Sequence, residues 1–430
     1  MNSFEDLGVP QNLLNKLSAQ GIDEPTPIQC KAIPKALDGR DILGLAQTGT
    51  GKTAAFVLPL LAQVLKIGGK REEKSVQSLI LAPTRELAKQ IDTTIKAFVE
   101  GSHLRVRLVV GGVSIAGQVK RLSKGSDILV ATPGRLIDLL DRNAVRLDDT
   151  KFLVLDEADQ MLDLGFIHSL RKIADLLPEN RQTMLFSATM PKKMSELASS
   201  YLSDPIRVEA APSGKVADKI TQSIHFVSKQ DKNKLLTDLL AHHKSELAIV
   251  FSRTKHGAEK LLKTIINSGC SAVSIHGNKS QAQRERALDA FRSGKNKVLV
   301  ATDVAARGLD IPLVKHVYNF DLPNVAENYV HRIGRTARAG SDGCAIAFCS
   351  SEEISELRAI QKILGTSIPV ASGKPWIDFD AEMRTRKNSK SRTKSRWNRK
   401  KFTGSSKKKN SFASPHKSRR GRSGKATLVA

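Results

Sequence analysis

Short apolar runs separated by helical patterns constrain the fold of this chain more than any other feature. From Asp41 to about Ile206 the runs are DILGLA, SLILAP, RVRLVV, DILVAT, FLVLDEAD and TMLFSAT, and stretches of helical periodicity such as KTAAFVLPLLAQVL separate them. Apolar runs without polar alternation are typical of strands buried on both faces of a parallel sheet. The rhythm therefore predicts an α/β domain whose strands are joined by right-handed helical crossovers.

The same rhythm returns in the second half of the chain. Residues 208–218, VEAAPSGKVAD, are small, polar or Pro/Gly, which is typical of a linker. After them come the runs ITQSIHFV, ELAIVFS, SAVSIHG, KVLVATD, HVYNF and CAIAFCS, ending near Leu364. We therefore predict two tandem α/β domains with parallel sheets, residues 1–207 and 219–365, each long enough to bury its own core.

Residues 366–430 are predicted to form a basic, disordered tail. Eighteen of the 69 basic residues and none of the 43 acidic ones lie at or after Arg384, so the net charge of +26 reduces to +8 before it. The hydrophobic period also disappears there, and such a composition cannot bury enough apolar area to offset ordering. A basic tail without an amphipathic apolar face indicates a nucleic-acid partner and not a membrane.

The cysteines and the N-terminus indicate a reducing compartment. Cys30, Cys270, Cys344 and Cys349 show no CxxC spacing, which predicts core thiols and no disulfides. The start MNSFEDLG has no basic region followed by an apolar run, and no 18 apolar residues follow one another. A cytoplasmic protein is the expectation.

The segment AQTGTGKT, residues 46–53, has the pattern of a phosphate-binding loop between a strand and a helix. Its glycines let the backbone wrap phosphates, the helix N-terminus adds its dipole, Lys52 reaches the β and γ oxygens, and Thr53 can ligate Mg²⁺. Ala46 replaces the first glycine of the general pattern but keeps a small residue. The loop therefore predicts a nucleotide triphosphate and Mg²⁺ as ligands.

Carboxylates follow the apolar run in FLVLDEADQML, residues 152–162. Ligands of open α/β sheets bind beyond the carboxyl ends of the strands, so Asp156 is the expected metal partner of the loop, directly or through water. Glu157 then lies near the γ-phosphate, where a carboxylate can orient and deprotonate the attacking water. Helix capping is the plainer alternative, which the phosphate loop makes minor.

Five motifs together carry a family resemblance. DEAD at 156–159, SAT at 187–189, PTREL at 83–87, TPGR at 132–135 and HRIGRTAR at 331–338 resemble the DEAD-box ATP-dependent RNA helicases, in the family's order and spacing from Phe4 to about Leu364. General similarity and the short basic tail point to the bacterial RhlE-like branch. The resemblance implies two tandem RecA-like P-loop domains, ATP and Mg²⁺ as cofactors, and RNA as partner.

The resemblance also assigns roles to residues around ATP. Catalysis falls to Lys52, Asp156, Glu157 and two arginine fingers, Arg335 and Arg338, in the second domain. Coupling between nucleotide and RNA falls to Asp159, Ser187, Thr189 and His331, with hydrogen bonds from Ser187 and Thr189 to Asp159. The implied ATP contacts are the adenine-reading Gln29, the base-stacking Phe4, the loop residues Ala46, Gln47, Thr48, Gly49, Thr50, Gly51, Lys52 and Thr53, and the ribose contact Asp310.

RNA contacts are implied in both domains, mostly of types suited to phosphates, which do not read sequence. They are Thr84, Arg85, Gly111, Gly112, Thr132, Gly134 and Arg135 in the first domain, and Arg253, Gly277, Gln281, Arg284 and Thr302 in the second.

The implied mechanism divides the ATP site between the domains, so RNA and ATP would favour the same closed form and unwind short duplexes locally. An alternative stays open from the sequence: an RNA chaperone that anneals or restructures RNA through its tail, with ATP only regulating attachment. Ribosomal precursors and an RNA-decay complex are the two candidate partners beyond RNA itself.

Overall fold

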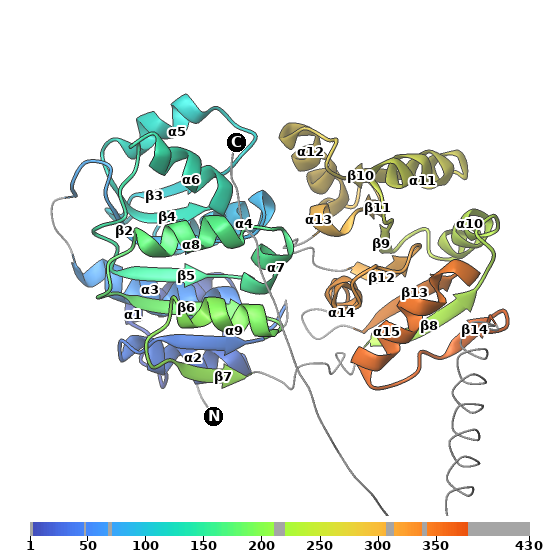
Figure 1. The fold of residues 1–430 in the computed structure, drawn as a ribbon, viewed down its shortest axis with the longest axis horizontal. Coiled ribbons are helices and arrows are strands. Elements are labelled where there is room, and N and C mark those ends of the chain that lie inside the picture. Colours follow the sequence, from blue (N-terminus) through green and yellow to red (C-terminus); the bar gives the residue numbers. More distant parts are fainter. Residues whose placement is uncertain are drawn as a thin grey trace, which may run out of the picture. The chain divides into compact units, whose positions relative to one another are not determined.

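Two seven-stranded parallel sheets form the core of the protein (Figure 1). The computed structural model describes residues 3–46, 49–67, 71–209, 220–306, 314–337 and 342–376. Every strand pair in both sheets is parallel. The predicted fold class, two tandem RecA-like α/β domains, is therefore confirmed.

The first sheet has the strand order β3-β4-β2-β5-β6-β1-β7, which places the strand before the phosphate loop and the strand before the DEAD sequence near its centre. Strand β6 alone lies between them. The strands are β1 Ile42–Leu45, β2 Val76–Leu81, β3 Val106–Val109, β4 Ser126–Ala131, β5 Phe152–Leu155, β6 Gln182–Ser187 and β7 Ile206–Glu209.

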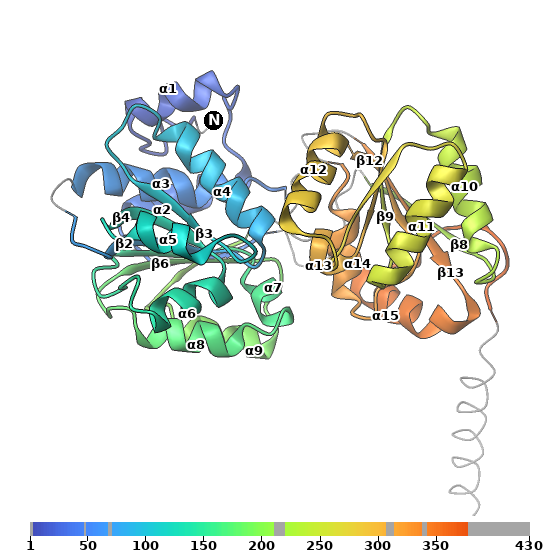
Figure 2. The ribbon, with the colours of Figure 1, turned by 90° about the horizontal axis from the view of Figure 1, so that it is seen from above.

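Helices cover both faces of the first sheet (Figure 2). Phe152 and Val154 enter the core under one set of helices, while Leu153 and Leu155 enter the core under the other set, which is why β5 is apolar at every position. The helices are α1 Gln11–Ala19, α2 Pro27–Leu37, α3 Lys52–Ile67, α4 Arg85–Phe98, α5 Ile115–Leu122, α6 Pro133–Asp141, α7 Ala158–Asp163, α8 Ile167–Asp175 and α9 Lys192–Ser199.

The second sheet has the order β10-β11-β9-β12-β13-β8-β14 and the same two-faced cover of helices. Its strands are β8 Ile220–Phe226, β9 Leu247–Phe251, β10 Ala272–Ile275, β11 Val298–Ala301, β12 Val314–Asn319, β13 Gly343–Cys349 and β14 Val370–Ser372. Its helices are α10 Lys232–His242, α11 Lys255–Asn267, α12 Gln281–Arg292, α13 Asp303–Ala306, α14 Glu327–Ile333, the 3-10 helix η1 Ser351–Glu353 and α15 Ile354–Leu364.

The structure moves one predicted domain boundary. Residues 366–376 belong to the second domain and not to the tail, because β14 pairs with β8, Ile368 is buried, and the Trp376 indole donates a hydrogen bond of 3.0 Å to the Cys349 carbonyl. A three-residue strand whose side chains are all exposed has no hydrophobic period to detect. The remaining tail, 377–430, lies outside the described residues.

The predicted linker is described only at its start. Val208 and Glu209 still pair with Gly44 and Leu45 of β1, and residues 210–218 lie outside the described part of the chain. All four cysteines are free thiols. None of the described helices is long and apolar enough to cross a bilayer.

Candidate functional site

The phosphate loop follows buried strand β1, whose extension at Ala46 donates a backbone hydrogen bond of 3.0 Å to the Ser187 carbonyl. Gly49 and Gly51 have φ values of 87° and 86°, which favour glycine, and a Cβ at Gly51 would lie 2.5 Å from the Gln29 side chain. Helix α3 then begins at Lys52. The predicted contacts Gln47 and Thr48 lie outside the described residues.

Two buried charged groups meet behind this loop. Lys52 is 6% exposed and Asp156 is 2% exposed, and neither Lys52 Nζ nor Asp156 Oδ1 has a hydrogen-bond partner among the residues that the structure describes. Burial raises the pKa of Asp156 to about 7, Lys52 opposes that rise, and Glu157 adds to it. Buried charges normally have partners, so this arrangement fits a ligand that supplies them.

The oxygen donors beside the loop fit Mg²⁺. Asp156 offers a buried carboxylate oxygen without a partner in the described chain, and the half-buried Thr53 offers a hydroxyl in the first turn of α3. Hard divalent cations prefer such oxygens. The residues that the sequence nominated for the metal are therefore of the right chemical type.

Glu157 has an uncommon backbone conformation. It precedes α7 with φ 52° and ψ 50°, the left-handed region, and it is 2% exposed. A non-glycine residue held there costs of order 1 kcal/mol or more, and such residues cluster at functional sites. The turn directs the chain from β5 into α7 immediately after Asp156.

Asp159 connects the DEAD sequence to the SAT sequence. Its Oδ2 accepts hydrogen bonds from Ala188 N at 3.1 Å, Thr189 N at 2.9 Å and the Thr189 hydroxyl at 3.0 Å. The hydrogen bond expected from Thr189 is thus present. The one expected from Ser187 is wrong, because its hydroxyl donates to the Thr189 carbonyl at 2.6 Å and closes the SAT turn.

The two adenine-site predictions meet different outcomes. Gln29 lies at the loop: its Nε2 donates to Gly51 O at 2.9 Å and its Oε1 accepts from Thr26 N at 2.9 Å, which leaves one donor and one acceptor for a base. Phe4, predicted to stack on the base, is instead 3% exposed within the hydrophobic core. Its ring has too little free surface for that role in this conformation, because the turn before α1 folds it inward.

The RNA residues predicted in the first domain gather at the ends of β2, β3 and β4. Thr84 caps α4 by accepting from Leu87 N at 3.2 Å, and Arg85 lies against the two glycines: a Cβ at Gly112 would be 2.1 Å from its guanidinium. Thr132 precedes α6, Gly134 lies in its first turn, and Arg135 donates to Val113 O at 3.1 Å. Gly111 and Gly112 therefore serve a close packing contact as well as any ligand.

The RNA residues predicted in the second domain also follow strand ends. Arg253 follows β9 and donates to Leu322 O at 3.0 Å and Glu353 at 3.1 Å. Gly277 follows β10 and is exposed, so that a Cβ added there would meet no described atom within 4 Å, and Thr302 follows β11. Gln281 and Arg284 lie in the first turn of α12, after the capping Ser280.

Comparison with known proteins decides the family. Residues 26–197 match the family described as DEAD/DEAH box helicase, and residues 231–340 match the Helicase conserved C-terminal domain. The chain belongs to the DEAD-box helicase family. The enzyme class predicted from the sequence, an ATP-dependent RNA helicase, is confirmed.

Solved structures of other helicases resemble this one along most of its length. S. cerevisiae Dbp5 bound to RNA and ADP BeF3 is 33% identical, with a TM-score of 0.77, 87% of this chain and 96% of that chain covered. Mss116 bound to ssRNA and UDP-BeF is 28% identical, with a TM-score of 0.79, covering 87% and 81%. A DEAD box protein from the hyperthermophile Methanococcus jannaschii is 36% identical, with a TM-score of 0.51, covering 86% and 99%.

The second domain of the helicase contains charged residues that the motifs did not single out. Arg332 is 2% exposed, and its guanidinium binds Asp303 at 2.5 and 2.8 Å, Asn319 at 3.0 Å and the Asp321 carbonyl at 2.6 Å. This network ties α14 to α13 and β12. Nothing in the sequence indicated this network, because the motif HRIGRTAR contains three arginines and the sequence does not show which of them is buried.

The predicted arginine fingers are described in part. Arg335 is 3% exposed, donates to the His331 carbonyl at 3.1 Å, and lines a small pocket with His331, Arg332 and Asp303. Arg338 and the predicted ribose contact Asp310 lie outside the described residues.

Proposed function

We propose that this helicase couples ATP binding and hydrolysis to closure of its two domains on RNA, and so separates or remodels short duplexes locally. One observation carries the ATP half of the proposal: Lys52 and Asp156 are buried together with polar atoms that no described group satisfies. A triphosphate and its metal ion supply the missing partners of both.

Four residues of the first domain divide the chemistry. Lys52 neutralises the β and γ oxygens, while Thr53 and Asp156 hold Mg²⁺, Asp156 directly or through water. The metal supplies positive charge at the oxygens where negative charge develops. Glu157, which directly follows Asp156 after the end of β5, orients the attacking water and takes its proton.

The second domain contributes positive charge to the transition state through Arg335 and Arg338. An arginine finger is worth roughly 10³ to 10⁵ in rate, so hydrolysis depends on the second domain reaching the nucleotide. The family pattern supports this assignment. In that pattern, ATP binding is coupled to RNA binding by Asp159, Ser187, Thr189 and His331. Because RNA and ATP favour the same closed form, each raises the affinity for the other.

RNA is held by its backbone. Dbp5 and Mss116 have solved structures with bound RNA, and this supports RNA as the partner here. The predicted contacts in this chain are guanidinium, hydroxyl and backbone NH groups, which read phosphates and not base sequence. We further place the chain in the bacterial RhlE-like branch, in the cytoplasm, acting on ribosomal precursors or within RNA decay.

Strand separation tests this function directly. A short labelled RNA duplex is mixed with the full chain and ATP, and release of the strand is followed, with ADP and a non-hydrolysable ATP analogue as controls. We expect ATP-dependent separation that declines as the duplex is lengthened. Separation that needs no ATP, or equal stimulation of ATP turnover by DNA of the same sequence, would contradict the proposal.

Deletion of residues 377–430 distinguishes the helicase from an annealing chaperone. The truncated chain should still separate short duplexes with ATP, but its RNA affinity should lose most of its salt dependence, which is roughly one unit of log-log slope per phosphate neutralised. If the truncated chain loses both strand separation and strand annealing, the tail and not the helicase domains would carry the activity.

A further inference from the structure

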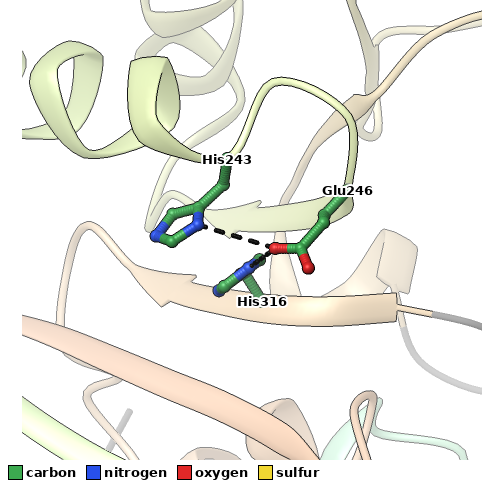
Figure 3. Close-up of side chains that lie close together, drawn as sticks. All are labelled: His243, Glu246 and His316. Carbon is green, nitrogen blue, oxygen red and sulfur yellow. Dashed lines mark hydrogen bonds and ion pairs between the residues drawn. The ribbon is translucent and has the colours of Figure 1, made fainter.

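A cluster of two histidines and one glutamate lies in the second domain, away from every motif used above (Figure 3). His243 follows α10, Glu246 directly precedes β9, and His316 lies on β12, whose register pairs it with Ala248 of β9. These residues lie where parallel strands begin. The ATP and RNA residues follow strand ends, at the opposite edge of a parallel sheet.

Both imidazole rings approach one carboxylate oxygen of Glu246. His316 Nε2 lies 2.5 Å from Glu246 Oε2, and His243 Nδ1 lies 3.5 Å from the same oxygen. The imidazole rings are stacked, with centroids 4.0 Å apart and planes at 28°. One nitrogen from each ring and a carboxylate oxygen all lie within 4.8 Å of one another.

His316 anchors the cluster from the core of the domain. Its side chain is 4% exposed, and Nε2 is the ring nitrogen that lies beside the Glu246 carboxylate. A metal ion at this position would replace the proton on Nε2, and the neutral ring would carry its proton on Nδ1.

Metal binding requires neutral imidazoles and an ionised carboxylate. A bound ion would therefore replace the proton that lies between His316 and Glu246.

We propose that His243, Glu246 and His316 bind a divalent transition metal ion, with Zn²⁺ the best match. Imidazole nitrogens suit Zn²⁺, Co²⁺ and Ni²⁺, whereas Mg²⁺ and Ca²⁺ select oxygen-only sets. A carboxylate and two imidazoles are an established zinc combination, with a fourth position left for water.

The geometry needs a small adjustment. Ligand atoms about 2.0–2.1 Å from a tetrahedral zinc lie roughly 3.4 Å apart. Glu246 Oε2 is already 3.5 Å from His243 Nδ1, but it must move about 1 Å away from His316 Nε2, from which it now lies 2.5 Å. His243 and Glu246 side chains are 33% and 41% exposed and can move, while the buried His316 remains fixed. The bound ion would join the end of α10 and the start of β9 to β12, and so stabilise this domain.

Zinc affinity of the untagged full chain tests the site. The chain, free of nucleotide, competes for Zn²⁺ with a chromophoric chelator, and we expect one site in the wild type. His243→Ala and Glu246→Gln should each weaken that site by at least about tenfold, because even indirect partners of metal ligands cost 10–100-fold. Both positions are partly exposed, so the fold should survive these changes.

Two control variants separate this site from other ligands. His256→Ala removes an exposed histidine of the same domain and should leave binding unchanged. Cys344 is the β13 residue that pairs with His316 of β12. Cys344→Ser removes its thiol, and this variant should also bind Zn²⁺ normally. A loss in Cys344→Ser would overturn the assignment of two histidines and one carboxylate.

Thermal unfolding gives a second readout, with the fluorescence of Trp376, which is hydrogen-bonded within this domain, as one probe. Zn²⁺ should raise the unfolding midpoint of the wild type and not of His243→Ala, while the midpoints without metal agree. No zinc site in the wild type, or equal affinity and equal stabilisation in wild type and His243→Ala, would overturn the proposal. RNA-stimulated ATP turnover should be the same in both, which makes the test independent of the helicase function.

Discussion

Two buried charged residues in each domain differ in whether they have partners: Lys52 and Asp156 in the first domain, and Arg332 and Lys232 in the second. In the first domain, Lys52 and Asp156 are buried with polar atoms that lack partners in the described chain. In the second, Arg332 is buried with every arm of its guanidinium engaged, and Lys232 donates to Glu353 at 2.6 Å and to the Phe320 carbonyl at 2.7 Å.

The difference distinguishes a site from a scaffold. A buried charge without a partner is costly, and a chain keeps one where a ligand completes it. A buried charge with all its partners present holds elements in place whatever is bound. Changes in the first set should therefore affect turnover, and changes in the second set should affect stability.

The largest expected effect tests whether an arginine of the second domain acts on the bound nucleotide. Arg338→Ala should lower RNA-stimulated ATP turnover by about 10³-fold or more, because it removes a proposed arginine finger. Steady-state ATP hydrolysis with saturating RNA measures it, and Arg292→Ala, exposed on α12, is the control. An unchanged rate in Arg338→Ala would argue against an ATP site shared by two domains.

The next effect concerns Glu157, the base that we propose in the first domain. Glu157→Gln should reduce turnover by about 10² to 10⁴-fold, since the amide cannot accept the water's proton. ATP binding, measured by a fluorescent analogue, should persist because the shape is kept. Glu196→Gln on the surface of α9 should hydrolyse normally, and equal rates in both variants would remove the role assigned to Glu157.

A change in the scaffold should give the reverse pattern. Arg332→Ala should lower the free energy of unfolding of the second domain by about 3–5 kcal/mol, because Asp303 loses its charged partner in a largely buried network. Urea unfolding followed by Trp376 fluorescence measures this loss. In Arg292→Ala the change should stay within about 0.5 kcal/mol; a similar loss in both variants would mean that the Arg332 network has no special weight.

The smallest expected effect is a pH dependence. Asp156 has its pKa raised from 3.8 to about 7 in the folded chain, so the folded state binds this proton more tightly than the unfolded state. Without Mg²⁺ and nucleotide, this carboxyl should therefore remove stability as the pH rises from about 4 to about 7.

Asp156→Asn isolates this contribution. The variant should be more stable than the wild type at pH 8 and equal to it near pH 4, in urea unfolding with a chelator present. If the stability difference between the two proteins did not change with pH, burial would not raise the pKa of Asp156. ATP affinity of the wild type should also weaken below about pH 7, because the protonated carboxyl no longer binds the metal.

Apolar patterning was enough to predict most of the fold. A short run such as FLVL, apolar at every position, is typical of a parallel strand that is buried on both faces. Both sheets contain the strands that these runs predicted. The edge strand β14 escaped prediction because its side chains are exposed and its three residues carry no period. The phosphate loop and the carboxylates after β5 were predictable because each motif lies within one strand-to-helix turn.

Particular contacts in the site were less predictable. Thr189 bonds to Asp159 as expected, but Ser187 turns to the Thr189 carbonyl, and Phe4 enters the core. Ser187 and Phe4 could each have contacted either of two chemically reasonable partners. The sequence does not show which partner lies within reach. The cluster at His243, Glu246 and His316 is a stronger case, because Glu246 and His316 lie 70 residues apart and only the pairing of β9 with β12 joins them.

Residue type and local order by themselves determined which chemistry we propose for this chain: a loop for phosphates, a carboxylate for a metal, and a second carboxylate for a proton. Tertiary structure alone decided which charges have partners and which await a ligand. The reason is physical: the cost of a buried charge depends on the groups within a few ångströms of it, and packing between distant segments sets those distances.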